Sequence, residues 1–294
     1  MDQARVPGRP PVGPFTLRQR LKELRCPVEY ATYFAIAPLL RGVYPLGPPQ
    51  AILCLPGGLV GDGLTAILRW GLRGHGYDAR GWGLGRNLGA NEETLAGMRA
   101  RVDELYALYD AKITIIGWSL GGIYGRMLAR DKPEKIRQVI SLASPFRMVE
   151  SDRFAPFGRA RWDRFVQEHS PELDLLWVHE HHRPPLTVPA TSIYSPTDGV
   201  APWQLSIDQT GPGAPNPRAE NVAVWGTHSG IGANPAALTV ILNRLAQPDD
   251  TWTPFNPIPL LRRWYLPPVS WSPPGGTNAL SNKPDVTARS EETP

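Results

Sequence analysis

The sequence predicts an α/β protein with a mostly parallel central sheet, flanked by helices and covered by a small helical cap. Short apolar runs rich in β-branched residues alternate with segments of helical periodicity between residues 51 and 246. A helix separates successive strands, and a connection of that length joins parallel strands. Residues 145–190 contain no strand-like run although they lie between two predicted strands, so we interpret them as the cap.

The segment from Lys112 to Arg130 carries the strongest functional motif. Residues 113–116 form a strand-like run that ends in the turn sequence GWSLG at 117–121, and the apolar residues after this turn have helical spacing. A strand, a tight turn and a helix are the context of a nucleophile elbow, in which a strained turn projects a serine hydroxyl above the sheet. We therefore identify Ser119 as the candidate nucleophile. An ordinary serine in a βα turn is the alternative.

A second strand, from Ala51 to Leu55, ends in a proline and a glycine pair at residues 56–58. Such a glycine pair leaves main-chain N–H groups free, as a developing oxyanion requires, although a plain tight turn has the same composition. The glycine-rich loop at residues 81–89 matches neither dinucleotide-binding nor P-loop spacing, so we expect no nucleotide and no cofactor. The other predicted elements are a helix from Ala66 to Gly74, a strand at 76–80, a helix from the N-cap Asn91 to Tyr109, strands at 136–144, 191–195 and 221–226, and a closing helix at 235–245.

Two further polar side chains follow strands in the second half of the chain. Asp198 lies in the turn after the strand at 191–195, and His228 follows the strand at 221–226. Histidine can take the proton of a serine hydroxyl, and a carboxylate can fix the tautomer of the imidazole and stabilise its protonated form. Ser119, Asp198 and His228 are therefore a candidate triad, although each of these residue types is also common in ordinary turns.

Four segments carry a resemblance to a known family: LPGG at 55–58, GWSLGG at 117–122, SPTDGVAPW at 195–203 and GTHSGIG at 226–232. Through them the chain resembles the α/β-hydrolase superfamily, in particular its lipase-like and esterase-like serine hydrolases. The resemblance implies the α/β-hydrolase fold and the hydrolysis of carboxylic esters through an acyl-enzyme. It also implies an oxyanion hole formed by the N–H groups of Leu120 and Gly58, with Leu59 as the near alternative to Gly58.

The same fold also hosts thioesterases, acyltransferases and relatives without catalytic activity. A thioesterase or acyltransferase with the same triad is therefore the first alternative to an esterase. A hydrolase-like binding protein is the second alternative, and the intact set of Ser119, Asp198 and His228 argues against it.

We expect the substrate to be a small-molecule ester with an apolar acyl or alcohol part. The candidate substrate-binding residues are Leu59, Trp118, Trp162 and Trp177. Trp162 and Trp177 lie in the predicted cap, where aromatic side chains can wall an apolar pocket. Attraction of an acidic substrate by the cap arginines at 159, 161 and 164 is the competing interpretation. The histidine-rich run at 179–182 lacks the spacing of a metal site, so we expect no metal.

The composition is that of an ordinary globular protein, with 41% hydrophobic and 20% charged residues. The net charge is +4, but Lys and Arg are scattered and form no basic block, which argues against nucleic-acid binding. Cys26 and Cys54 have neither metal nor redox spacing, so we expect free thiols and a cytoplasmic protein. The sequence contains neither a signal-peptide pattern nor a transmembrane pattern, and it does not indicate the oligomeric state.

We expect one domain at residues 15–272, with disordered ends at 1–14 and 273–294. The apolar stretch from Tyr30 to Leu40 is expected to pack on the core, and a flap over the site is the alternative. The Pro- and Trp-rich segment at 251–271 is expected to form an extended arm over the body of the domain.

Overall fold

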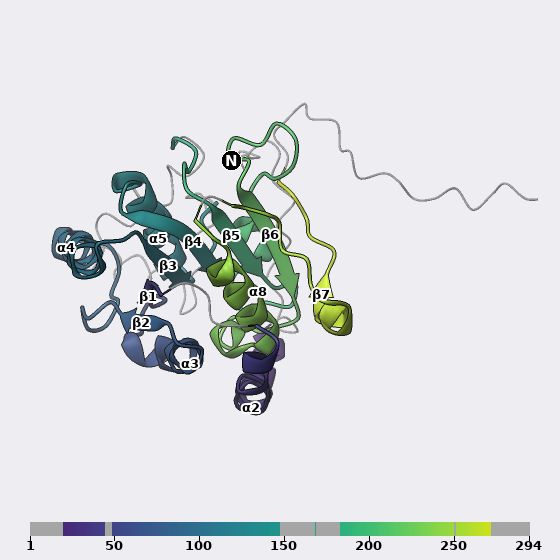
Figure 1. Ribbon diagram of the computed structural model, residues 1–294. Coiled ribbons are helices and arrows are strands. Elements are labelled where there is room, and N and C mark those ends of the chain that lie inside the picture. The colour runs from purple at the N-terminus through teal and green to yellow at the C-terminus, as the bar shows by residue number, and fades with distance from the viewer. Residues whose placement is uncertain (1–19, 45–48, 148–167, 169–182, 250, 272–294) are drawn as a thin grey trace, which may run out of the picture.

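A computed structural model describes residues 20–44, 49–147, 168, 183–249 and 251–271. Its centre is a seven-stranded sheet with the strand order β2-β1-β3-β4-β5-β6-β7 (Figure 1). Every neighbouring pair is parallel except β6 and β7, which confirms the predicted, mostly parallel sheet. The strands are β1 (Ala51–Leu55), β2 (Asp78–Gly81), β3 (Ile113–Trp118), β4 (Ile136–Leu142), β5 (Ala190–Tyr194), β6 (Ala219–Val224) and β7 (Tyr265–Leu266).

Helices cover both faces of the sheet. Figure 1 shows α2 (Cys26–Ile36), α3 (Asp62–Gly74) and α8 (Pro235–Ala246) on one face, and α4 (Glu92–Tyr109) and α5 (Leu120–Asp131) on the other. Because successive side chains of a strand point to opposite faces of the sheet, β1 contributes apolar residues to the core on both faces. Ile52 and Cys54 join the core under α3 and α8, whereas Leu53 and Leu55 join the core under α4 and α5.

The N-terminus of α4 agrees with its prediction from the sequence, whereas that of α3 does not. The side chain of Asn91 accepts a 2.8 Å hydrogen bond from the N–H of Thr94, as its predicted N-cap role requires. Helix α3 begins at Asp62 rather than at the predicted Ala66. Its first turn is held by tertiary contacts, because the Asp62 carboxylate accepts the N–H groups of Trp82 and Gly83. Such contacts leave no apolar pattern in the sequence.

Both ends of the described chain pack on the body of the domain. The N-terminal part forms a 3₁₀ turn, η1 (Lys22–Arg25), followed by α2, and it packs on the core through the fully buried Tyr33. At the other end, the expected extended arm contains a 3₁₀ helix, η7 (Pro259–Trp264), and adds β7 to the sheet by antiparallel pairing with β6. The sequence does not predict this strand, because a run of two residues is too short to show an alternating pattern.

Most of the predicted cap, together with Trp162 and Trp177, lies outside the described residues, as do the predicted disordered ends at 1–14 and 273–294. The division into domain, cap and tails therefore stays a prediction. Within the described ranges, no helix combines the length and the apolar character needed to cross a membrane.

The parallel register brings four strand ends to one edge of the sheet. Leu55 of β1 pairs with Gly117 of β3, and Tyr194 of β5 pairs with Ala223 of β6. Because these strands are parallel, the segments that follow them leave at the same edge, where open α/β sheets bind ligands. Residues 56–59, 119, 195–202 and 225–230 all follow directly from this edge.

Candidate active site

Ser119 stands on a strained turn between β3 and α5. Its backbone has φ 53° and ψ −119°, a conformation that costs a non-glycine residue about 1–3 kcal/mol. Two glycines of the motif make the turn possible by close approach. A Cβ on Gly117 would overlap the carbonyl oxygen of Gly121, and a Cβ on Gly121 would overlap that of Leu55. The Ser119 residue is only partly buried.

The loop after β1 lies beside this turn. A Cβ on Gly57 would stand 3.3 Å from the Cβ of Ser119, and one on Gly58 would stand 3.5 Å from Cδ2 of Leu120. The N–H of Leu59 donates a 2.7 Å hydrogen bond to the carbonyl of Asn87, so it is not free to bind an oxyanion. Between the two sequence candidates for the second oxyanion donor, this bond favours Gly58 over Leu59.

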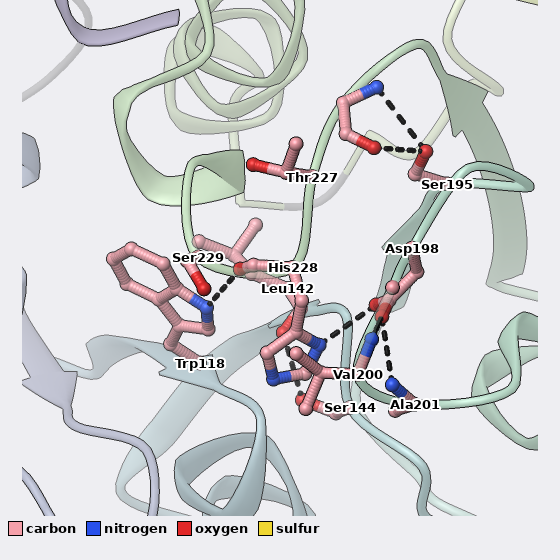
Figure 2. A network of polar contacts seen from close by, with 12 residues as sticks. Trp118, Leu142, Ser144, Ser195, Asp198, Val200, Ala201, Thr227, His228 and Ser229 are labelled. Carbon is pink, nitrogen blue, oxygen red and sulfur yellow. Dashed lines mark hydrogen bonds and ion pairs between the residues drawn. The ribbon is translucent and has the colours of Figure 1, made fainter. Parts of the chain in front are cut away.

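Asp198 and His228 are in direct contact. Asp198 Oδ2 lies 2.7 Å from His228 Nδ1 (Figure 2). Asp198 Oδ1 accepts the N–H groups of Val200 and Ala201, each at 2.7 Å, which fixes the carboxylate on its own turn. Because an ionised carboxylate only accepts hydrogen bonds, Nδ1 carries a proton, and the neutral ring keeps its lone pair on Nε2. This is the tautomer that a general base needs.

The electrostatic environment of His228 favours its protonated form. Burial lowers the pKa of the imidazole, but the Asp198 carboxylate raises it through its charge and its hydrogen bond, and the charge of Glu23 raises it further. The net result is a pKa above the ordinary value for histidine. The side chains of Asp198 and His228 are both buried, so water screens their interaction little.

A comparison with known protein families agrees with the parallel sheet and flanking helices described above. The family model of the alpha/beta hydrolase fold matches residues 62–204. The chain belongs to the α/β-hydrolase superfamily.

The individual relatives are distant or cover little of the chain. A stretch of 67 residues, 23% of this α/β hydrolase, is 33% identical to the biotin biosynthesis bifunctional protein BioHC of Teredinibacter turnerae, and it spans 12% of that protein. Among solved structures, lipase B of Aspergillus fumigatus has a TM-score of 0.49 at 16% identity, over 68% of this chain and 53% of that one. The monoacylglycerol lipase of Paleococcus ferrophilus has a TM-score of 0.49 at 15% identity, over 68% and 96%.

The position of Trp118 changes the role that we assign to it. We expected this residue to line the substrate pocket, but its side chain is 2% exposed in the core of the α/β hydrolase. Its indole Nε1 donates a 3.0 Å hydrogen bond to the main-chain carbonyl of His228, as Figure 2 shows. Trp118 therefore supports the segment that carries His228. Of the other pocket candidates, Leu59 is partly exposed beside Gly58, and Trp162 and Trp177 lie outside the described residues.

The segments that carry Asp198 and His228 are tied to each other at their bases. We call residues 195–202 the acid loop and residues 225–230 the histidine loop. In the acid loop, Ser195 Oγ and Thr197 Oγ1 both donate to the carbonyl of Gly226 in the histidine loop, at 2.6 and 2.8 Å. Ser195 Oγ also accepts the N–H of Gly226 at 3.1 Å (Figure 2). The two loops of this α/β hydrolase thus hold one another in register.

Asp208 is the next carboxylate after Asp198, and the structure gives it a different partner. Both of its oxygens are bound by the guanidinium of Arg126 at 2.8 Å, in a pair that is almost fully buried. Arg147 approaches the same carboxylate at 3.4 Å. This arrangement makes Asp208 part of a structural ion pair rather than a competitor for His228.

Two residues that sequence reasoning missed support the candidate site. Asn87, fully buried in the glycine-rich loop, donates from Nδ2 to the carbonyl of Pro56 at 2.9 Å and braces the loop that carries Gly58. Glu23 of η1 binds main-chain groups beside Asp198 and His228. Its only sequence signal is a glutamate in a short basic stretch. Among the described residues, no cluster of His, Cys, Asp and Glu has the makeup of a metal site, and Cys26 and Cys54 are free thiols.

Proposed function

We propose that this α/β hydrolase is a serine hydrolase that cleaves small-molecule carboxylic esters with an apolar acyl or alcohol part. Ser119 is the nucleophile, His228 the general base and acid, and Asp198 the group that orients His228. The observation that carries the proposal is the 2.7 Å contact between His228 Nδ1 and Asp198 Oδ2, at the sheet edge from which the strained Ser119 turn also leaves.

The chemistry follows from the roles of these groups. The lone pair on Nε2 of His228 takes the hydroxyl proton while Ser119 Oγ attacks the ester carbonyl carbon. The oxyanion that forms accepts hydrogen bonds from the N–H groups of Gly58 and Leu120. His228 then returns the proton to the leaving alcohol, which gives an acyl-enzyme. A water molecule repeats the sequence and releases the acid.

Several features support Gly58 and Leu120 as the oxyanion donors. Leu120 is the first residue of α5, where the helix itself supplies no acceptor for the main-chain N–H. Among the described residues, neither N–H is bound to a main-chain carbonyl, whereas the neighbouring Leu59 N–H is. The macrodipole of α5 adds partial positive charge at the same point. The partly exposed side chains of Leu59 and Leu120 offer apolar surface for an acyl chain.

Labelling and turnover together test this proposal. A fluorophosphonate probe should modify Ser119, as located by peptide mass spectrometry, and the Ser119→Ala variant should fold normally and lose both labelling and turnover. With p-nitrophenyl esters, kcat/KM should rise from acetate to hexanoate and change little with salt, because each buried methylene contributes about 0.8 kcal/mol.

The same experiment separates the alternatives. Labelling of another serine, or undiminished hydrolysis by Ser119→Ala, contradicts the assignment of the nucleophile. Faster turnover of an acyl-CoA thioester than of any oxygen ester indicates a thioesterase. A preference for acetate that depends strongly on salt indicates charge recognition of the substrate instead of apolar recognition.

A further inference from the structure

The carboxylate of Glu23 accepts three main-chain hydrogen bonds beside the candidate site. Its Oε1 accepts the N–H of Gly199 and the N–H of His228, both at 2.8 Å, and its Oε2 accepts the N–H of Ser229 at 3.0 Å. Glu23 lies in η1, 176 residues before Gly199 and 205 residues before His228. Hydrogen bonds to an ionised acceptor are about twice as strong as neutral ones.

These three bonds join the acid loop and the histidine loop at or next to the candidate catalytic residues Asp198 and His228. Gly199 directly follows Asp198 in the acid loop, and His228 and Ser229 form the tip of the histidine loop. The bonds from Ser195 and Thr197 to Gly226 fasten the bases of the loops, so they do not fix the residues further along. Glu23 fixes the main chain at His228 itself and the main chain next to Asp198.

We propose that Glu23 is a positioning residue, which holds the Asp198 and His228 side chains in their mutual geometry and His228 in reach of Ser119. This inference rests on the proposed function, because it gives Glu23 a task only in relation to His228. Without the carboxylate, the N–H groups of Gly199 and His228 lose their acceptor in a partly buried place, which favours displacement of both loops.

The charge of Glu23 contributes a second effect. A negative charge near His228 favours the imidazolium that forms during acylation, and among the described residues Glu23 and Asp198 are the carboxylates that raise the pKa of this ring. Glu29 of α2 acts one residue earlier in the histidine loop, where it accepts the N–H of Thr227 at 2.8 Å and its hydroxyl at 3.1 Å. Glu23 therefore combines a geometric and an electrostatic influence on His228, whereas the hydrogen bonds of Glu29 reach only the preceding residue.

The test compares Glu23→Gln and Glu23→Asp with a matched control, Glu104→Gln. Glu104 lies on the exposed surface of α4, so its replacement changes the net charge equally without touching the site. Glu23→Gln removes the negative charge and replaces one carboxylate oxygen by an NH₂ group, which cannot accept a hydrogen bond from a main-chain N–H. We expect kcat for a p-nitrophenyl ester to fall about tenfold, which corresponds to about 1.4 kcal/mol in the barrier, with KM nearly unchanged. The acidic limb of the kcat/KM profile should move to lower pH, because loss of the negative charge lowers the pKa of His228.

Two further results complete the expected pattern. Glu23→Asp keeps the charge and should recover part of the activity and most of the pH profile, and Glu104→Gln should match the unmodified protein. In proton NMR, the downfield signal of the His228 Nδ1 proton, assigned with His228→Gln, should weaken or shift in Glu23→Gln only.

A contrary result is equally clear. If folded Glu23→Gln retains the kcat, the pH profile and the Nδ1 signal of the unmodified protein, the inference is wrong. A lower melting temperature with unchanged pH profile and Nδ1 signal also overturns it, since that outcome means a structural role alone. If Glu23→Gln does not fold, Glu23→Asp decides by its kcat: the shorter side chain should lower kcat while the pH profile is largely kept, and an unchanged kcat overturns the inference. If the unmodified protein neither turns over esters nor reacts at Ser119, the proposed function fails, and the NMR titration of His228 still decides whether Glu23 positions it.

Discussion

Trp118 Nε1 donates a hydrogen bond of 3.0 Å to the carbonyl of His228, so the residue before the candidate nucleophile holds the main chain of the candidate base. The indole ring also lies so close to Gly232 that a Cβ there would overlap it. The elbow and the histidine loop are therefore one packed unit, although they are 110 residues apart in sequence.

Replacement of Trp118 by phenylalanine tests this connection. Phenylalanine keeps an aromatic ring against Gly232 but leaves the His228 carbonyl without its donor. We expect the free energy of unfolding to fall by about 1–3 kcal/mol, because a buried acceptor becomes unsatisfied. We also expect kcat to fall severalfold as the imidazole becomes less well placed. Urea unfolding and steady-state kinetics measure the two effects, and unchanged values for both would show that the bond has no functional weight.

Asp198 and Asp208 should respond differently to the same substitution. Asp198→Asn keeps the shape of the side chain but no longer fixes the tautomer of His228, so we expect kcat to fall about 10⁴-fold, as the corresponding change of aspartate to asparagine does in the triad of a serine protease. Asp208→Asn breaks a buried ion pair with Arg126 and should lower the free energy of unfolding by about 3–5 kcal/mol. Its kcat, measured on the folded fraction, should change far less. A larger loss of kcat in Asp208→Asn would mean that the acid is misassigned.

Much of this arrangement is predictable because it rests on local patterns. The β-branched runs of β1 and β3 and the G-x-S-x-G sequence around Ser119 each carry their signal within a few residues. The order of Ser119, Asp198 and His228 then follows from where the strands end. The predicted N-cap role of Asn91 is confirmed for the same reason, because capping depends on the next three residues.

The supporting residues could not be predicted in this way. Glu23, Glu29 and Asn87 act through hydrogen bonds to main-chain groups that are distant in sequence or placed by tertiary packing. A main-chain N–H or carbonyl exists at almost every position, so the partner leaves no residue type to recognise. A glutamate in a short basic helix therefore has the pattern of an ordinary solvated residue. Trp118 shows the reverse problem, because its aromatic character suggested a pocket wall while the fold buries it.

The glycines of the elbow should be sensitive to the smallest substitution. Gly121→Ala places a methyl group against the carbonyl of Leu55, and we expect the free energy of unfolding to fall by about 1–3 kcal/mol. Gly63 of α3 is the matched control, since a Cβ there meets nothing within 4 Å. Gly63→Ala should leave the stability equal or raise it by about 0.5–1 kcal/mol. Equal effects of the two substitutions in urea unfolding would contradict the close packing of the elbow on β1.

Glu29 gives the stability a specific dependence on pH. Burial raises the pKa of its carboxyl from 4.5 to about 7, although the hydrogen bonds from Thr227 act in the opposite direction. The folded state therefore binds the proton more tightly than the unfolded state does. The resulting stabilisation is fully present below about pH 4.5 and is lost as the pH rises through about 7.

Comparison with Glu29→Gln isolates this effect, because glutamine does not titrate. The difference in free energy of unfolding between the unmodified protein and Glu29→Gln should shift against the unmodified protein between pH 5 and pH 8. Urea unfolding at the two pH values measures it. A difference that is constant, or that moves in favour of the unmodified protein at pH 8, would show that the pKa of Glu29 is not raised.

The most direct test of the whole account is a crystal structure of the protein after reaction with an alkyl fluorophosphonate. We expect phosphorus bonded to Ser119 Oγ, with the phosphonyl oxygen about 2.7–3.1 Å from the main-chain nitrogens of Gly58 and Leu120. His228 should face the adduct through Nε2 and keep its bond to Asp198. An adduct on another residue, or a phosphonyl oxygen turned away from both nitrogens, would contradict the proposed mechanism.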